Sequence, residues 1–197
     1  MNIDKAIKKQ NSSHKRFVLI MCFIFFMNPL LFVLSGVYNL FLIAYLAIIE
    51  VLIIIAILVK KDGKTMSYEY YNGKLKLSQG LLKNKCSIHC SKVVFVHVES
   101  KNENKEKDLD ILMITNSRFR NKKIREVDFC FLKNYPYVKK EYEKLKALNP
   151  EEEYYYIIVS KGKLTKYKLL MEIYKRCVNA KFSEAAIDAI KIWYSLG

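Results

Sequence analysis

The sequence predicts a membrane-anchored α+β protein: two apolar helices, then an antiparallel β-domain, then a small helical section. Three observations lead to this prediction. The chain of 197 residues is almost free of charge over 17–59, it alternates apolar and polar residues from Met66 onward, and helical periodicity replaces that alternation after Pro136. The mean hydropathy of +0.01 is therefore an average over unlike parts and does not indicate an ordinary soluble chain.

The first two elements are predicted from uncharged length. Residues 17–34 form a stretch of eighteen residues with no charge, and residues 37–59 form one of twenty-three with a single charge, Glu50. At about 1.5 Å per residue these helices reach roughly 27 and 34 Å, which matches a hydrocarbon core of about 30 Å. Only Ser35 and Gly36 separate them, so we expect a transmembrane hairpin. A cleaved signal peptide before a single anchor is disfavoured, because no small-residue cleavage site precedes the second stretch.

The orientation of the hairpin follows from its basic flanks. Residues 1–16, the basic N-terminal segment, carry five cations, and three more follow the second stretch. These are Lys5, Lys8, Lys9, Lys15 and Arg16, and then Lys60, Lys61 and Lys64. The connecting turn has no charge. Because cytoplasmic flanks collect Lys and Arg, both termini are predicted to be cytosolic in a multi-pass protein.

Two polar features interrupt the apolar stretches. Asn28 precedes Pro29 in the first stretch, where the proline removes a backbone donor and is expected to kink the helix. Glu50 lies deep in the second, where a charge is costly. We predict an intramembrane contact made by Asn28 and Glu50, within the hairpin or between protomers. A helix-packing role is favoured over an ion or proton path, since polar side chains commonly join helices.

The five cysteines do not indicate a disulfide framework, because their number is odd and the domain is placed in the cytosol. They are Cys22, Cys86, Cys90, Cys130 and Cys177. Cys86 and Cys90 flank His89, but a structural zinc site needs four ligands and no second pair is present. Cys86, Ile88 and Cys90 share one face of a strand and are predicted to be core residues. The sequence predicts no metal and no cofactor.

The β-domain is predicted from short runs of period two that are separated by turn residues. Asn72-Gly73 between two such runs is the strongest short hairpin signal in the chain, and Gln79-Gly80 marks a second turn. The predicted strands lie at 66–71, 74–78, 81–89, 92–98 and 109–115. The polar stretch 99–108 is predicted to be an exposed loop. The result is an antiparallel meander.

A helix is predicted over 137–148, because apolar residues recur there at helical spacing. They are Val138, Tyr142, Leu145 and Leu148. Pro136 suits the start of this helix, and Asn149-Pro150 ends it. This helix closes the predicted domain 66–149.

Residues 150–197 are predicted to form a separate C-terminal section with one strand in 151–163 and two helices. The first helix, over 166–179, would be capped by Thr165, and the second, over 184–195, by Ser183. The residues expected to face inward are Tyr167, Leu170, Met171 and Tyr174, and then Ala186, Ile187, Ile190, Trp193 and Tyr194. The pair suggests a helix-turn-helix, but its second helix holds one basic residue, Lys191, so nucleic acid is not an expected partner.

The stretch YEYYNGKLKLSQGLLKNKCSIHCSKVVFVHVES, residues 68–100, resembles the bacterial pleckstrin-homology-like family. The shared features are the preceding apolar hairpin, the Gly80-Leu81-Leu82 turn, and the β-run Val93–Val98. His89-Cys90 stands where that family often has a proline. The resemblance covers about 66–148 and implies a PH-like partial barrel capped by a helix, acting as a scaffold or binding module. It also implies a bacterial cytoplasmic (inner) membrane location.

Charge is the clearest functional feature of the remaining sequence. No nucleophile elbow, P-loop, dinucleotide fingerprint or zinc-protease motif is present, so no catalytic residue is predicted. The net charge of +15 lies mainly after residue 59. One cluster is predicted to bind an acidic partner or anionic lipid, although a solvated sheet edge would look the same. It comprises Arg118, Arg120, Lys122, Lys123 and Arg125.

These features together predict a non-enzymatic scaffold that assembles partners at the inner membrane surface. The expected partners are the anionic lipids of the inner leaflet and proteins of a membrane complex. A second copy of the chain, in a homo-oligomer, is a third possible partner. The alternative is a membrane effector, or a subunit of a secretion, conjugation or sporulation machine, whose hairpin oligomerises.

Overall fold

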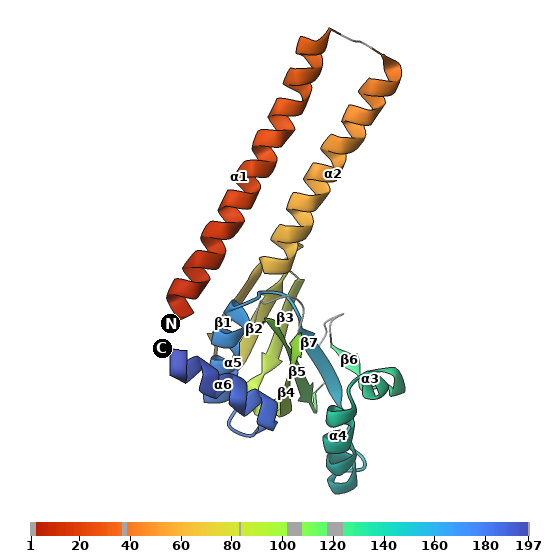
Figure 1. Ribbon diagram of the computed structural model, residues 1–197. Coiled ribbons are helices and arrows are strands. Elements are labelled where there is room, and N and C mark those ends of the chain that lie inside the picture. The colour runs from red at the N-terminus through yellow and green to blue at the C-terminus, as the bar shows by residue number, and fades with distance from the viewer. Residues whose placement is uncertain (1–2, 37–38, 83, 102–107, 118–123, 197) are drawn as a thin grey trace. The chain divides into compact units, whose positions relative to one another are not determined.

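The computed structural model describes residues 3–36, 39–82, 84–101, 108–117 and 124–196. The chain divides into two compact units, Met1–Lys64 and Thr65–Gly197 (Figure 1). We call the first the hairpin and the second the α+β unit. The fold class is confirmed at this level, because two long apolar helices precede antiparallel sheets and further helices.

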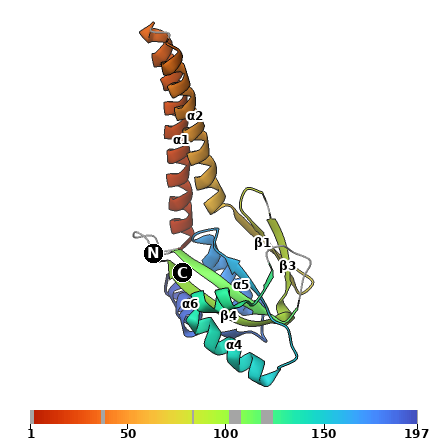
Figure 2. The same ribbon diagram turned by 90° about the vertical axis from the view of Figure 1, so that its right-hand side faces the viewer.

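The hairpin consists of α1 (Ile3–Ser35) and α2 (Leu40–Lys64), which run side by side (Figures 1 and 2). Both are long and apolar enough to cross a membrane. Each extends beyond its predicted apolar stretch, because the basic flanks are helical too. The Lys60 ammonium lies 3.4 Å from the centre of the Phe17 ring. The start of the first apolar stretch and the end of the second therefore lie side by side along the hairpin.

The α+β unit begins with a three-stranded antiparallel sheet in the order β1-β2-β3. Its strands are β1 (Met66–Tyr71), β2 (Lys74–Gln79) and β3 (Asn84–His89). Asn72 and Gly73 have φ angles of 47° and 71°, as a two-residue turn of type I′ requires. This hairpin signal is therefore confirmed. A 3₁₀ turn over Cys90–Lys92 then carries the chain into the second sheet.

The second sheet has five strands in the order β6-β7-β5-β4-β8. They are β4 (Val93–Lys101), β5 (Asp108–Thr115), β6 (Arg125–Glu126), β7 (Tyr155–Val159) and β8 (Lys181–Phe182). The pairings are antiparallel except for β4 with β8, which is parallel. Of the predicted loop 99–108, the ends belong to β4 and β5, and 102–107 lies outside the described residues.

The C-terminal section is not separate from the β-domain, which differs from the boundary predicted at residue 149. Strand β7 lies between β5 and β6, and β8 lies against β4. Residues 150–197 thus supply two of the five strands and belong to the same compact unit. The suggested helix-turn-helix is also wrong, because the segment between its helices includes strand β8.

Both faces of the five-stranded sheet are covered. Against one face pack the three-stranded sheet and α5 (Thr165–Arg176) with α6 (Glu184–Leu196). Against the other pack α3 (Phe129–Asn134) and α4 (Pro136–Leu148). Figure 1 shows the two helix pairs on opposite sides of the sheet. Cys86, Ile88 and Cys90 are buried in the first core, as predicted.

The predicted helices exist, with corrections at their ends and faces. Helix α4 begins at Pro136 and is capped by Asn149, as expected, but Leu148 is 77% exposed. Helix α5 is not capped by the Thr165 side chain and ends at Arg176. Tyr174, Ile187 and Tyr194, expected to face inward, are exposed, and the Trp193 side chain lies outside the described residues. The Ser183 cap is confirmed, since its hydroxyl accepts from the Ala186 amide at 3.2 Å.

Candidate partner-binding cleft

The predicted basic cluster cannot be placed as a group. Arg118, Arg120, Lys122 and Lys123 lie outside the described residues. Arg125 is in the edge strand β6, where it is exposed and pairs through its backbone with Tyr156. The cluster therefore stays a prediction from the sequence.

Both predicted intramembrane residues lie within the hairpin helices. Asn28 is on α1 and Glu50 on α2, and each is half-buried. Among the described residues, no hydrogen bond joins Asn28 to Glu50. The predicted contact, within the hairpin or between protomers, stays a prediction.

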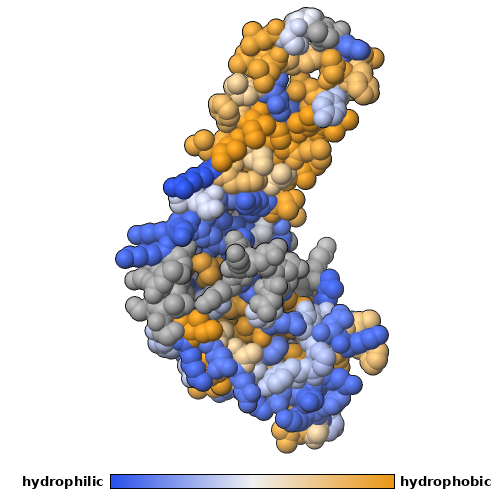
Figure 3. Space-filling model, in the orientation of Figure 1, coloured by the Kyte–Doolittle hydropathy of each residue, from blue (hydrophilic) through white to orange (hydrophobic). Residues whose placement is uncertain are grey.

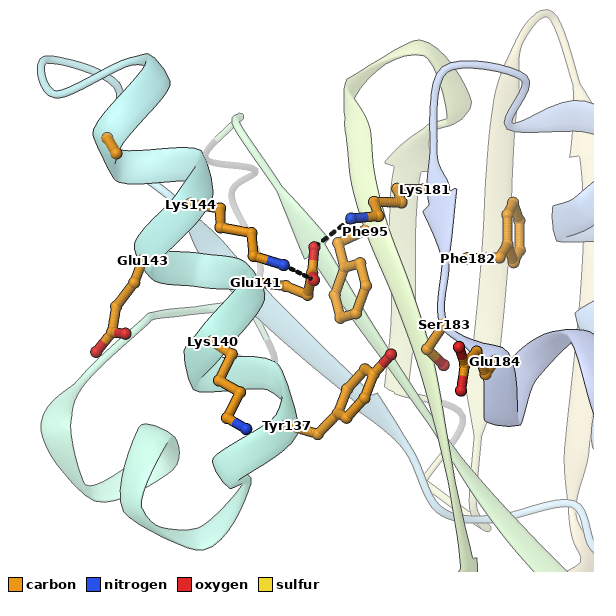
Figure 4. Close-up of a pocket in the computed structure, with 11 residues that line it drawn as sticks. Phe95, Tyr137, Lys140, Glu141, Glu143, Lys144, Lys181, Phe182, Ser183 and Glu184 are labelled. Carbon is orange, nitrogen blue, oxygen red and sulfur yellow. Dashed lines mark hydrogen bonds and ion pairs between the residues drawn. The ribbon is translucent and has the colours of Figure 1, made fainter.

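A cleft of the α+β unit lies between α4 and the start of α6. Its volume is about 730 Å³, within the range of roughly 300–1,000 Å³ that ligand sites occupy. Strands β4 and β8 complete its walls (Figure 4). The lining residues are Phe95, Tyr137, Lys140, Glu141, Glu143, Lys144, Ala147, Lys181, Phe182, Ser183 and Glu184.

One carboxylate ties the two sides of the cleft together. Glu141 on α4 accepts from Lys144 at 2.7 Å and from Lys181, on β8, at 2.6 Å. The hydrogen bonds from these two lysines lower the pKa of Glu141 below its ordinary value. The Glu141 side chain is only 13% exposed, whereas both lysine side chains are more than 60% exposed. A ligand can therefore reach the ammonium groups more readily than the carboxylate.

Tyr137 lines the cleft and stacks on a histidine behind it. The Tyr137 ring stacks on the His97 ring at 4.9 Å between centres, and the His97 Nδ1 lies 2.9 Å from the Ser183 hydroxyl oxygen. Burial lowers the pKa of His97, so the neutral ring is favoured. This contact joins β4 to the start of α6 and holds Tyr137 in place.

The serine–histidine pair has the arrangement of a helix cap. The Ser183 hydroxyl is hydrogen-bonded to His97 Nδ1 and accepts from the Ala186 amide, and Ser183 is 3% exposed. The hydroxyl therefore has two hydrogen-bond partners within the fold. Nor do the described residues include a group of three His, Cys, Asp or Glu side chains that could hold a metal ion.

Sequence reasoning missed this cleft for a topological reason. Tyr137, Glu141 and Lys144 follow each other at helical spacing, so their common face on α4 was readable from the sequence. Their partners Lys181 and Ser183 come from the stretch that was assigned to a separate section. Only the pairing of β8 with β4 brings the residues of α4 next to Lys181 and Ser183, and no local sequence pattern predicts this pairing.

A second charged cluster lies inside the unit. The Lys166 ammonium is fully buried and lies 2.8 Å from Asp108 and 3.4 Å from Asp110, and it donates to the Ser160 carbonyl at 2.8 Å. Two carboxylates and a carbonyl satisfy the three ammonium protons. This cluster joins the N-terminus of α5 to strand β5 and has a structural role.

Comparison of the chain with protein-family models, with curated proteins and with solved structures found no match. The chemistry of the cleft therefore has to be argued from its own residues. It offers exposed ammonium groups on two elements, an aromatic floor and two further carboxylates, Glu143 and Glu184. Aromatic side chains are enriched at surfaces that bind proteins, and the cleft presents Tyr137 between its charged residues.

Proposed function

We propose that this chain is a non-enzymatic, membrane-anchored interaction module of the bacterial cytoplasmic membrane. The hairpin spans the bilayer with both termini in the cytosol, and the α+β unit gathers a protein partner at the inner surface. The observation that carries the proposal is the uncovered apolar surface of the hairpin. Within the apolar stretches of α1 and α2, almost no side chain is buried, as expected if lipid is their solvent.

The PH-like assignment of residues 66–148 is part of this proposal. Its support is the antiparallel meander of β1, β2 and β3, followed by the β4–β5 pair and the helix α4. Two features go beyond what the resemblance implies. Strand β7 enters the sheet next to β5, and β8 adds a parallel edge beside β4.

The cleft between α4 and β8 is the proposed partner site. A partner segment with an acidic and an aromatic side chain would meet the exposed ammonium groups of Lys144 and Lys181 and stack on Tyr137. Tyr137 is 44% exposed, while its inner face rests on His97. A rigid, half-exposed tyrosine is the kind of residue that carries much of the binding energy at interfaces.

Co-purification from native membranes tests the proposed function. The full chain would be extracted with mild detergent as wild type, as Tyr137→Ala/Lys181→Glu, and as the matched control Tyr71→Ala/Lys74→Glu on another strand pair. We expect a partner at fixed stoichiometry with wild type and control, and its loss with the cleft variant. Equal recovery with all three, or recovery of the chain alone, would contradict the assignment of the cleft.

A further inference from the structure

The α+β unit begins directly after the hairpin in the sequence. Thr65, the first residue of the unit, is bonded to Lys64, the last residue of α2. Helix α2 continues for five residues beyond Val59, where the apolar stretch ends, which is about 8 Å at 1.5 Å per residue. However the unit is turned, Thr65 therefore lies near the outer edge of the lipid headgroups if the hairpin spans a bilayer.

The β2–β3 turn lies beside Thr65. The Gly80 amide donates to the Thr65 carbonyl at 2.8 Å, and Met66 pairs with Gln79. The loop before α5 lies there as well, since a side chain at Gly162 would come within 2.7 Å of the Met66 sulfur. Figure 1 shows this loop and the turn at the same end of the unit. We call this surface the linker end and define it by Leu82, Lys85, Lys161 and Lys163.

The linker end combines an exposed apolar side chain with cations. Leu82 is 86% exposed at the tip of the turn, Lys85 is exposed on β3, and Lys161 and Lys163 are half-exposed. A single exposed leucine is ordinary on a protein surface, so its exposure alone means little. Its position is what matters, because Leu82 is two residues from Gly80, whose amide donates a hydrogen bond to the Thr65 carbonyl.

We propose that the linker end is a bilayer-contact surface, in which Leu82 enters the headgroup layer while Lys85, Lys161 and Lys163 face anionic lipid phosphates. This inference rests on the proposed membrane anchoring. An apolar side chain flanked by lysines suits an interface where the tip is apolar and the surroundings are anionic. The contact would orient the unit on the membrane and leave the cleft between α4 and β8 open to a partner.

The unit offers a matched control at its other end. Val178 is 85% exposed, nearly the same as Leu82. It lines a shallow hollow together with Asn72 and Gly73, the turn at the opposite end of strands β1 and β2. Both side chains are thus aliphatic and almost equally exposed, and they differ in the end of the unit at which they lie.

Quenching of tryptophan by brominated lipid tests the inference on the full chain in lipid vesicles, which hold no other tryptophan. In a Trp193→Phe background, which removes the one tryptophan, we would compare Leu82→Trp, Val178→Trp and Ile54→Trp. We expect about half of the Leu82→Trp fluorescence to be lost, since interfacial side chains lie about 5–10 Å deep. Val178→Trp should be unaffected, and Ile54→Trp, on the apolar part of α2, should be quenched most.

The outcomes separate this inference from the proposed function. If Ile54→Trp is quenched and Leu82→Trp matches Val178→Trp, the bilayer-contact surface is overturned and the membrane anchor stands. If Ile54→Trp is not quenched, the anchor itself fails. Replacing roughly one-third of neutral lipid by phosphatidylserine should deepen the quenching of Leu82→Trp, and Lys85→Glu should reverse that gain. An equal signal in both lipids would overturn the role of the lysines.

Discussion

The two units of this chain place the same kind of side chain in opposite surroundings. Ile54 on α2 is 46% exposed, whereas Ile111 in the centre of the five-stranded sheet is fully buried. Apolar residues cover most of the face of the hairpin seen in Figure 3. The α+β unit gathers its apolar residues into two cores on either side of one sheet. The free energy of an exposed apolar side chain depends on the solvent that surrounds it. Exposure of the hairpin's apolar side chains is costly in water and favourable in lipid.

The largest effect on stability is expected at Lys166, whose ammonium group is the one that is fully buried among the described residues. This charge is an exception in the mostly apolar interior of the α+β unit. Lys166→Met leaves Asp108 and Asp110 without their shared cation, and breaking a buried pair in this way costs about 3–5 kcal/mol. Chemical unfolding of the full chain in detergent measures this loss. Lys191→Met, which removes an exposed pair with Asp188, is the control and should change stability by less than about 1 kcal/mol. Equal stabilities of the two variants would show that the buried cluster does not stabilise the unit.

A second prediction contrasts exposed leucines in the two units. Leu52 on α2 is 58% exposed and Leu148 on α4 is 77% exposed. Leu52→Lys should disfavour membrane insertion by about 3 kcal/mol, whereas Leu148→Lys should have little effect, because only the first position would face lipid in the proposed spanning hairpin. The fraction of protein that resists alkaline extraction from membranes measures insertion. If both variants are retained equally, the contrast between the units fails at this position.

Much of the fold was predictable where a local signal decides the structure. Asn72-Gly73 placed the β1–β2 turn, and Pro136 and Asn149 bounded α4. The uncharged stretches gave the two helices of the hairpin. In these cases the residues that specify the element lie within it, so no knowledge of the rest of the chain was needed.

The unpredicted parts depend on contacts between distant residues. Strand β7 was expected in a separate section, but its burial depends on β5, whose residues lie 40 to 48 positions earlier (Thr115 pairs with Tyr155, and Ile111 with Val159). Helix α3 was missed because its six residues are too few for a periodic pattern, although Asp128 caps it at 2.7 Å. The cleft was missed for the same reason as β7, since its two walls come from segments about forty residues apart in the sequence.

A smaller effect is expected from pH, and only in the α+β unit. Burial lowers the pKa of His97 in the folded state, so the unfolded chain binds the proton more readily. Stability is therefore complete above the ordinary value of 6.5 and falls as the pH drops below it. His97→Gln should flatten this dependence, measured by thermal unfolding between pH 7 and 5. A wild-type curve that is already flat would contradict the role of His97 behind the cleft.

Sidedness of labelling in intact bacterial cells tests the central claim most directly. Cys130 is exposed on the α+β unit, and Cys86, Cys90 and Cys177 are buried. With Cys22→Ser and Ser35→Cys in place, the chain has one reactive thiol at the end of α1, next to the turn of the hairpin, and one on the unit. A membrane-impermeant maleimide should label Ser35→Cys in intact cells and Cys130 only after lysis. Labelling of Cys130 from outside, or protection of Ser35→Cys until lysis, would contradict a spanning hairpin with a cytosolic unit.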